Sequence, residues 1–132
     1  MTCCAETSYC SRAEIYLGAA ANPAKAKGVA QKAVIRNVSK TLEGQPAKRL
    51  IIAANFYTSC ALLLELLERD YYYLGTHRND RLDWPTNVGY KQKKRPKSMP
   101  RGTYRLAQAK PFPELVAVSW MDSKSVSMIA TG

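Results

Sequence analysis

The sequence predicts an α/β fold with a mixed, mostly parallel sheet, because segments typical of strands and helices alternate along its first part. Apolar residues recur at helical spacing in residues 29–42, and they surround most of a second predicted helix at residues 60–69. Short runs rich in aromatic or β-branched residues lie before, between and after these helices. The three expected strands are residues 8–17, 49–54 and 71–75.

Neighbouring residues set the bounds of the two predicted helices. Gly44 and Pro46 end the first helix, since neither favours a continued helical backbone. The hydroxyl of Thr58 or Ser59 can accept a free backbone N–H at the start of the second. Between them, residues 49–54 form a continuous apolar run, so we expect a strand that is covered on both faces.

The composition changes in the second part of the chain. Residues 76–101 contain three prolines and a basic run, which indicates an exposed loop. Asp122 and Ser123 favour a turn between the last two strand-like runs, which we expect to form a β-hairpin. We therefore predict a core in residues 1–76 and a β-rich segment in residues 77–132. The expected strands of this segment are residues 103–107, 114–120 and 125–130.

Charge and composition restrict the partners and the location of the chain. Its 132 residues include 20 Lys and Arg against 10 Asp and Glu, and this excess favours nucleic acid, an anionic membrane surface or an acidic protein. No secretory signal is visible, and the longest apolar stretch is too short to cross a bilayer. We expect an intracellular protein with no membrane partner. The four cysteines lack the spacing of zinc ligands, so we expect free or buried thiols and no metal site.

A basic run in the predicted loop is the candidate DNA-binding site. Its cations can contact phosphates, and Tyr90 or Tyr104 can stack on bases. A solvated loop and a nuclear localisation signal are the alternatives, so we also consider a nuclear location. The candidate residues are Lys91, Lys93, Lys94, Arg95 and Lys97.

The remaining polar candidates do not form a catalytic group. His77 is the only histidine and has no nucleophile or metal-ligand pattern beside it, so we expect a surface residue. Asp80 and Asp83 flank a turn, where solvated carboxylates are common. Trp84 and Trp120 are expected to pack.

Two linked motifs resemble the piggyBac transposase family. The run Asn55-Phe56-Tyr57-Thr58-Ser59 follows an apolar strand and precedes a Leu-rich helix, and YYYLGTHRND comes after it in the same order as in that family. The C-terminal hairpin VAVSWMDSKSVSMIATG also fits. A weaker N-terminal match aligns Cys4, Tyr9 and Tyr16-Leu17-Gly18 with an Asp, a Tyr and Tyr-Leu-Gly. The resemblance covers nearly the whole chain but only the middle of a full transposase.

The resemblance implies a ribonuclease-H-like fold whose three aspartates hold two Mg²⁺ ions for DNA strand transfer. Cys4 and Ala54 stand at the first two aspartate positions, and the third position lies beyond Gly132. A thiol is a poor Mg²⁺ ligand and an alanine has no ligand atom, so the resemblance implies that the metal site and the activity are lost. Glu6, two residues from Cys4, is the nearest carboxylate that a shifted alignment could use.

We therefore expect an incomplete ribonuclease-H-like core followed by a β-rich insertion segment. The expected function is that of an inactive transposable-element-derived fragment with at most weak, sequence-independent DNA binding. The alternative is a domesticated interaction module that pairs with another transposase-like chain through an open sheet edge or the hairpin. Residual nuclease activity is a third reading. Missing strands and helices would leave apolar surface open and make the chain marginally stable or dependent on a partner.

Overall fold

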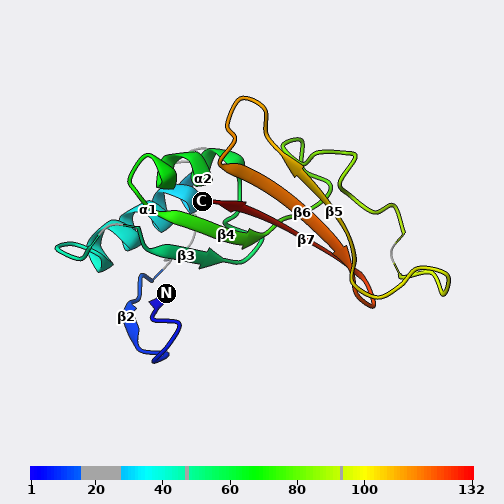
Figure 1. The fold of residues 1–132 in the computed structure, drawn as a ribbon. Coiled ribbons are helices and arrows are strands. Elements are labelled where there is room, and N and C mark those ends of the chain that lie inside the picture. Colours follow the sequence, from blue (N-terminus) through cyan, green and yellow to red (C-terminus); the bar gives the residue numbers. More distant parts are fainter. Residues whose placement is uncertain (16–27, 47, 93) are drawn as a thin grey trace. The chain divides into compact units, whose positions relative to one another are not determined.

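The computed structural model of the chain describes residues 1–15, 28–46, 48–92 and 94–132. These residues belong to two units, Met1–Pro46 and Ala47–Gly132 (Figure 1). Each unit has its own internal contacts. In the described residues, no helix is long and apolar enough to span a membrane.

A small set of polar contacts organises the first unit. Asn37 is buried in the helix, where its Oδ1 accepts from Arg12 Nε at 3.0 Å and its Nδ2 donates to Glu14 Oε2 at 2.9 Å. An ion pair between Arg36 and Glu14 reinforces the same connection. Within this unit, β1 (Thr2–Cys3) pairs antiparallel with β2 (Cys10–Arg12), and the helix is α1 (Val29–Thr41).

The first predicted strand is much shorter than expected. Only β2 is extended within residues 8–15, while residues 16 and 17 lie outside the described part of the chain. This strand pairs with β1 in a separate two-stranded sheet and not with the strand of residues 49–54. The predicted parallel core of three strands is therefore wrong at its first strand. The helix predicted for residues 29–42 is confirmed as α1.

The second unit is built on a five-stranded mixed sheet with the order β3-β4-β7-β6-β5 (Figure 1). Only β3 and β4 are parallel, and the other three neighbouring pairs are antiparallel. The prediction of a mostly parallel sheet is wrong, because the C-terminal hairpin adds its strand β7 to the edge of β4. The elements are β3 (Leu50–Ala53), α2 (Cys60–Leu67), β4 (Tyr72–Thr76), β5 (Thr103–Gln108), β6 (Leu115–Met121) and β7 (Ser125–Thr131).

The helix α2 packs against β4 and β7 and covers one face of this sheet. The Ser59 hydroxyl accepts from Leu62 N at 3.3 Å, which confirms the predicted N-cap. The leucines of the helix that face the sheet are fully buried. Gly75 is required where the helix start meets β4, because a Cβ there would lie 2.5 Å from Thr58 Oγ1. The buried leucines are Leu62, Leu63 and Leu66.

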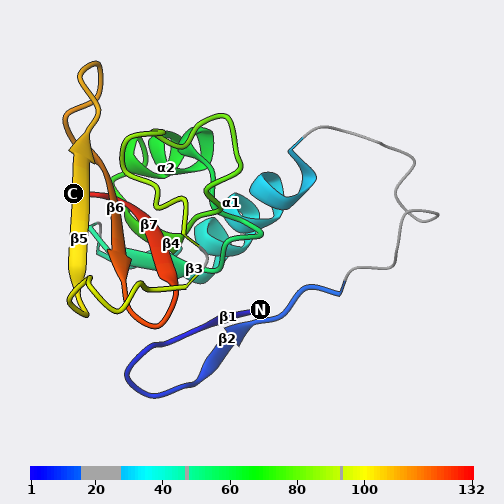
Figure 2. The same cartoon turned by 90° about the vertical axis from the view of Figure 1, so that its right-hand side faces the viewer.

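The other face of the sheet is not covered by any described segment of the second unit (Figure 2). Leu50 and Ile52 on β3 are 53% and 62% exposed. The expectation that residues 49–54 are buried on both faces is therefore wrong. The continuous apolar run predicts the strand correctly. Burial of its second face would need another layer of structure, which the described residues of the second unit do not form.

Candidate functional site

The junction between β3 and α2 is where the resemblance places a metal-binding carboxylate. Ala54 is the first residue after β3, and its carbonyl accepts from Tyr57 N and from Thr58 Oγ1, both at 3.1 Å. These bonds close a turn. Two further carbonyl groups of the turn accept hydrogen bonds from the Arg81 guanidinium. Arg81 donates from Nη2 to Asn55 O at 3.1 Å and from Nη1 to Thr58 O. The turn is thus fixed by Arg81, the residue that directly follows the second motif.

Contacts of the turn with β4 and with the segment after it give a physical reason why the two motifs occur together. Residues 55–59 make the turn, and the segment after β4 supplies the guanidinium that holds it. Thr58 also contacts the Tyr73 hydroxyl at 2.9 Å, so the turn is bound to β4 as well. The sequence analysis missed Arg81, since a separation of 23 and 26 residues leaves no local signal.

The side chains at the expected metal positions do not fit a divalent cation. Ala54 offers only a methyl group at the end of β3, and Cys4 is an exposed thiol in the first unit. Hydrogen bonds with Thr7 lower the pKa of the Cys4 thiol, but sulfur remains a poor ligand for Mg²⁺. No group of three or more potential ligands among His, Cys, Asp and Glu occurs in residues 1–15, 28–46, 48–92 and 94–132.

The basic run is divided between exposed lysines and one anchored arginine. Lys91, Lys94 and Lys97 are exposed, whereas Lys93 lies outside the described residues. Arg95 is half-buried: its backbone N–H donates to Ser123 O at 3.1 Å, and its Nη1 donates to Met99 O at 2.6 Å. Arg95 therefore attaches the loop to the β6–β7 turn, and three described lysines remain for a polyanion.

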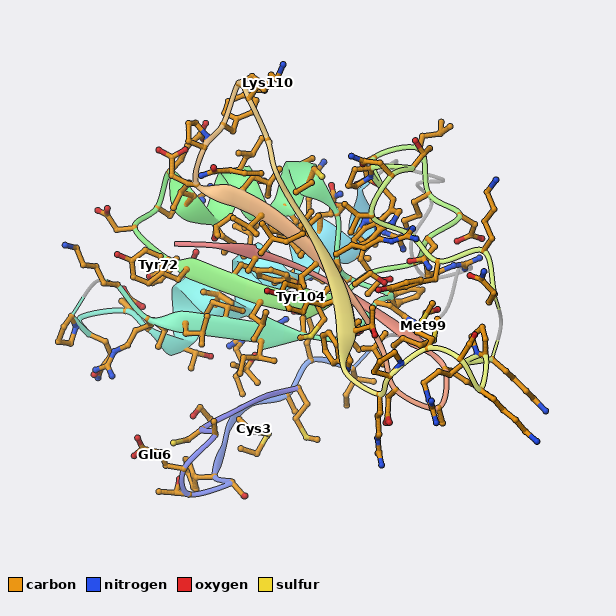
Figure 3. All side chains as sticks on the ribbon, turned by 45° about the vertical axis from the view of Figure 1, so that its right-hand side comes forward. Cys3, Glu6, Tyr72, Met99, Tyr104 and Lys110 are labelled. Atoms are coloured by element: carbon orange, nitrogen blue, oxygen red, sulfur yellow. The ribbon has the colours of Figure 1, made fainter. Side chains whose placement is uncertain are left out.

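The two tyrosines proposed for base stacking differ in access. Tyr90 is only 7% exposed, its hydroxyl donates to Thr103 O at 3.0 Å, and the Arg105 guanidinium lies 4.5 Å above its ring. These contacts leave no free ring face for a base, so Tyr90 is a packing residue. Tyr104 is 69% exposed and projects from β5 (Figure 3). Only Tyr104 remains a candidate for stacking.

His77 is buried, contrary to the expectation of a surface residue. Its side chain has no exposed area, its Nδ1 lies 2.9 Å from Arg78 O, and its ring stacks on Trp84 at 5.2 Å. A carbonyl can only accept, so Nδ1 carries a proton. His77 Nε2 lies 3.2 Å from Asp83 Oδ1, at ion-pair distance although without hydrogen-bond alignment.

Asp83 is partly exposed, as expected for a turn carboxylate, but it also contacts the start of a helix. Its Oδ2 accepts from Cys60 N at 3.1 Å at the start of α2, where the helix dipole favours a negative charge. Burial raises the pKa of Asp83, but the Cys60 N–H and the adjacent His77 outweigh it and leave this pKa below its ordinary value. Asp80 agrees with the expectation, because it is exposed and paired with Arg78.

A pocket of about 280 Å³ lies beside Asp83, between the start of α2 and strands β5 to β7. Its lining is mostly apolar and includes Cys60, Trp84 and Leu115. Burial, together with Asp83, raises the pKa of the Cys60 thiol to about 11. The thiol is therefore protonated at neutral pH and is not an activated nucleophile.

Two comparisons with known proteins show a family and a fold to which the chain is similar. The profile of the family described as Transposase IS4 matches residues 1–132. Among solved structures, a piggyBac transposase in a synaptic complex with hairpin DNA is similar, with a TM-score of 0.62 and 24% sequence identity. The match covers 87% of this chain and 22% of the transposase chain, so the sequence corresponds to less than a quarter of that protein. No curated protein matches the sequence.

Proposed function

Because the chain belongs to the Transposase IS4 family, we propose that it is a catalytically inactive, piggyBac-type transposase derivative that binds DNA weakly and without sequence preference. The single observation that supports inactivity is Ala54. It follows β3 directly, at the position where the resemblance expects a metal-binding aspartate. A two-metal mechanism needs charged oxygen ligands, and this position has none.

We also propose that the β3–α2–β4 unit is part of an incomplete ribonuclease-H-like core. The support is its parallel pairing, Leu50 with Tyr72 through Ala53 with Gly75, and the helix that connects the two strands. In the same proposal residues 77–132 belong to an insertion segment. Strands of that segment share the sheet with β4, so the two parts form one structure in the second unit.

DNA binding is proposed through Lys91, Lys94 and Lys97. All three are exposed, and they lie in a loop that Arg95 holds against the β6–β7 turn. Phosphate contacts of this kind carry no sequence information, so the binding is expected to be non-specific. A nuclear location follows from this proposal, because the partner is DNA.

The DNA proposal predicts a steep salt dependence. Binding of duplex DNA to the full chain should weaken as NaCl rises, because each neutralised phosphate releases counterions. Substituting Lys91, Lys94 and Lys97 with Gln should flatten the log–log salt slope by up to about 2.7, at about 0.9 for each contact. Fluorescence anisotropy of a labelled duplex measures this slope.

The matched control changes the same amount of charge elsewhere. Lys32, Lys40 and Lys110 are also exposed, and their replacement by Gln should leave most of the slope intact. An equal effect of both triple variants would show that net charge alone attracts the DNA. Affinity that does not respond to salt would refute the proposal.

Loss of activity predicts that the purified chain does not nick supercoiled plasmid DNA with Mg²⁺ or Mn²⁺. The reason is that Ala54 supplies no carboxylate to a two-metal site. Gel electrophoresis of the plasmid measures nicking, and EDTA controls for metal dependence. Metal-dependent nicking that disappears in Glu6→Gln would contradict the proposal, because Glu6 is the carboxylate near the first expected position.

The second candidate function is an interaction module that pairs through the edge strand β3. Leu50–Ala53 is an apolar edge without a lysine, proline or charged residue, whereas the opposite edge strand β5 contains Arg105 and Gln108. Unprotected edges readily accept another strand, and a related transposase chain is the proposed partner. Under this alternative, the Gln variants of the loop lysines bind the protein partner as tightly as the original chain.

A further inference from the structure

The face of the sheet opposite α2 is continuous, apolar and free of charged side chains. We name it the open face, and it comprises Leu50, Ile52, Tyr104, Leu106 and the residues in register between them on β4, β6 and β7. These four residues are 53%, 62%, 69% and 60% exposed. Tyr72 and Tyr104 mark two of its strands (Figure 3).

Cross-strand register makes this face one surface instead of scattered apolar residues. Leu106 pairs with Val118, which pairs with Met128, and the next row joins Tyr104 to Trp120 and Val126. The inner members of these rows are half-buried. Apolar area of this kind costs about 25 cal/mol for each Å² left in water, so a contiguous face favours a covering layer.

The opposite face shows what such a layer contributes. There Tyr73, Ala117 and Ile129 are buried under α2 and the loop that contains Trp84. A parallel pair such as β3–β4 is normally covered on both faces, usually by helices. No described segment of the second unit forms a layer over the open face, and a helix is the element that suits a mixed sheet with a helix already on its other side.

Charge decides which kind of helix fits. Ala47–Gly132 has 14 Lys and Arg against seven Asp and Glu, a difference of +7. Exposed cations border the open face at both ends of its strands, Arg49 and Lys110 at one end and Lys124 at the other. Two acidic residues also lie there, Glu114 near Lys110 and Asp122 in an ion pair with Arg101, so the excess of positive charge comes from the other three cations and the net charge of the unit. A second copy would bring like charges together, and α1 has three basic and no acidic residues. Acidic residues of a partner would be attracted by the cations at the border of the open face.

We propose that the open face binds an amphipathic helix of another protein, with an apolar stripe against the sheet and acidic residues on its flanks. Four inter-strand spacings of about 4.8 Å make the face roughly 19 Å wide. At about 1.5 Å per residue, a helix of about 13 residues spans this width. The partner helix is thus expected to have about four turns, with apolar residues at positions i, i+3, i+4 and i+7.

The test uses the full chain and a synthetic 18-residue helical peptide with a leucine stripe and glutamates at all other positions. One control peptide keeps the stripe but has lysines in place of the glutamates, and another scrambles the first. Binding is measured by anisotropy of the labelled peptide and by Trp fluorescence. Trp120 lies on the open face and Trp84 on the buried face, so bound peptide should shift the Trp120 emission to shorter wavelength.

Two variants with the same charge change locate the binding surface. Leu106→Asp places a carboxylate on the open face and should weaken glutamate-peptide binding at least about tenfold, since that charge would be buried and repelled. Leu82→Asp makes the same change at an exposed leucine off this face and should change the affinity less than about twofold. If circular dichroism shows that Leu106→Asp is unfolded, Tyr104→Ser replaces it.

Three results would overturn the proposal. The first is no binding of the glutamate peptide by the folded chain. The second is binding of the lysine peptide or the scrambled peptide as tightly as the glutamate peptide. The third is a dimer in sedimentation equilibrium that strengthens with salt and is lost in Leu106→Asp but kept in Leu82→Asp. That pattern would make a second copy the occupant of the open face.

Discussion

At the scale of single residues, the contacts of a side chain in the fold determine its role. Asp83 connects three elements, because it accepts from the start of α2, neighbours the buried His77 at the end of β4 and lines the pocket. Arg81 holds the turn after β3 in the same way. These residues are structural, and none of them supplies an activated nucleophile.

The lowered pKa of Asp83 predicts a defined pH dependence of stability. Its carboxylate stabilises the fold above the ordinary Asp pKa of about 3.9, and this contribution is lost as the pH falls through the lower pKa of the folded state. Asp83→Asn should reduce the free energy of unfolding at pH 6, and the difference from the original chain should shrink toward pH 3. Urea unfolding across this range measures it.

Asp70→Asn is the control for that experiment, because it removes one carboxylate of the same unit from a turn after α2. The difference between the two variants isolates the role of the contacts that Asp83 makes with Cys60 and His77. An Asp83→Asn variant whose deficit is constant from pH 3 to pH 6 would argue against a stabilising charge at this position.

At the scale of elements, the β6–β7 hairpin joins the parallel pair β3–β4 to the edge strand β5. Its seven cross-strand pairs run from Leu115–Thr131 to Met121–Ser125, and β7 also pairs with β4. Half of the side chains on its covered face are apolar and half are hydroxyl-bearing, and Ser119 and Ser127 are opposite each other. Their hydroxyls are 3.0 Å apart and buried, so each satisfies the other.

This pair predicts a non-additive response to mutation. Ser119→Ala or Ser127→Ala alone should destabilise the chain by about 1–3 kcal/mol, because one buried hydroxyl loses its partner. The double variant should recover most of that loss, since no unpaired hydroxyl remains. Chemical denaturation of the four proteins gives the coupling energy. Additive losses would mean that the two hydroxyls act independently.

At the scale of the whole molecule, charge and apolar surface suit different partners. The formal net charge of +10 favours DNA in the proposed function, and the exposed lysines of residues 91–97 concentrate part of it. The open face is uncharged and favours a protein element in the further inference. The salt and peptide experiments separate these two activities, because only one of them depends on Lys91, Lys94 and Lys97.

The sequence predicted the local elements of this chain well. Two helices and the strands β3 to β7 occur within one or two residues of their expected bounds, since periodicity, breakers and the Ser59 cap are local signals. The paired motifs at residues 55–59 and 71–80 identified the transposase family, which the family profile confirms. Ala54 is visible in the sequence in the same way, and the loss of a metal-binding carboxylate at this position stays a prediction from the resemblance.

Only the tertiary structure decided which strands pair and which side chains are covered. The antiparallel addition of β7 to β4, the burial of His77 and Tyr90, and the anchoring of Arg95 all depend on residues far apart in the chain. Whether a residue is buried depends on the segments that pack against it. The apolar run of β3 therefore could not reveal that one of its faces is exposed. Sequence determined the family and the elements, because both follow from residue type and spacing. Contacts between residues that are far apart in the chain determined the order of the strands in the sheet. The same contacts determined which side chains are anchored, which are accessible, and which surface remains for a partner.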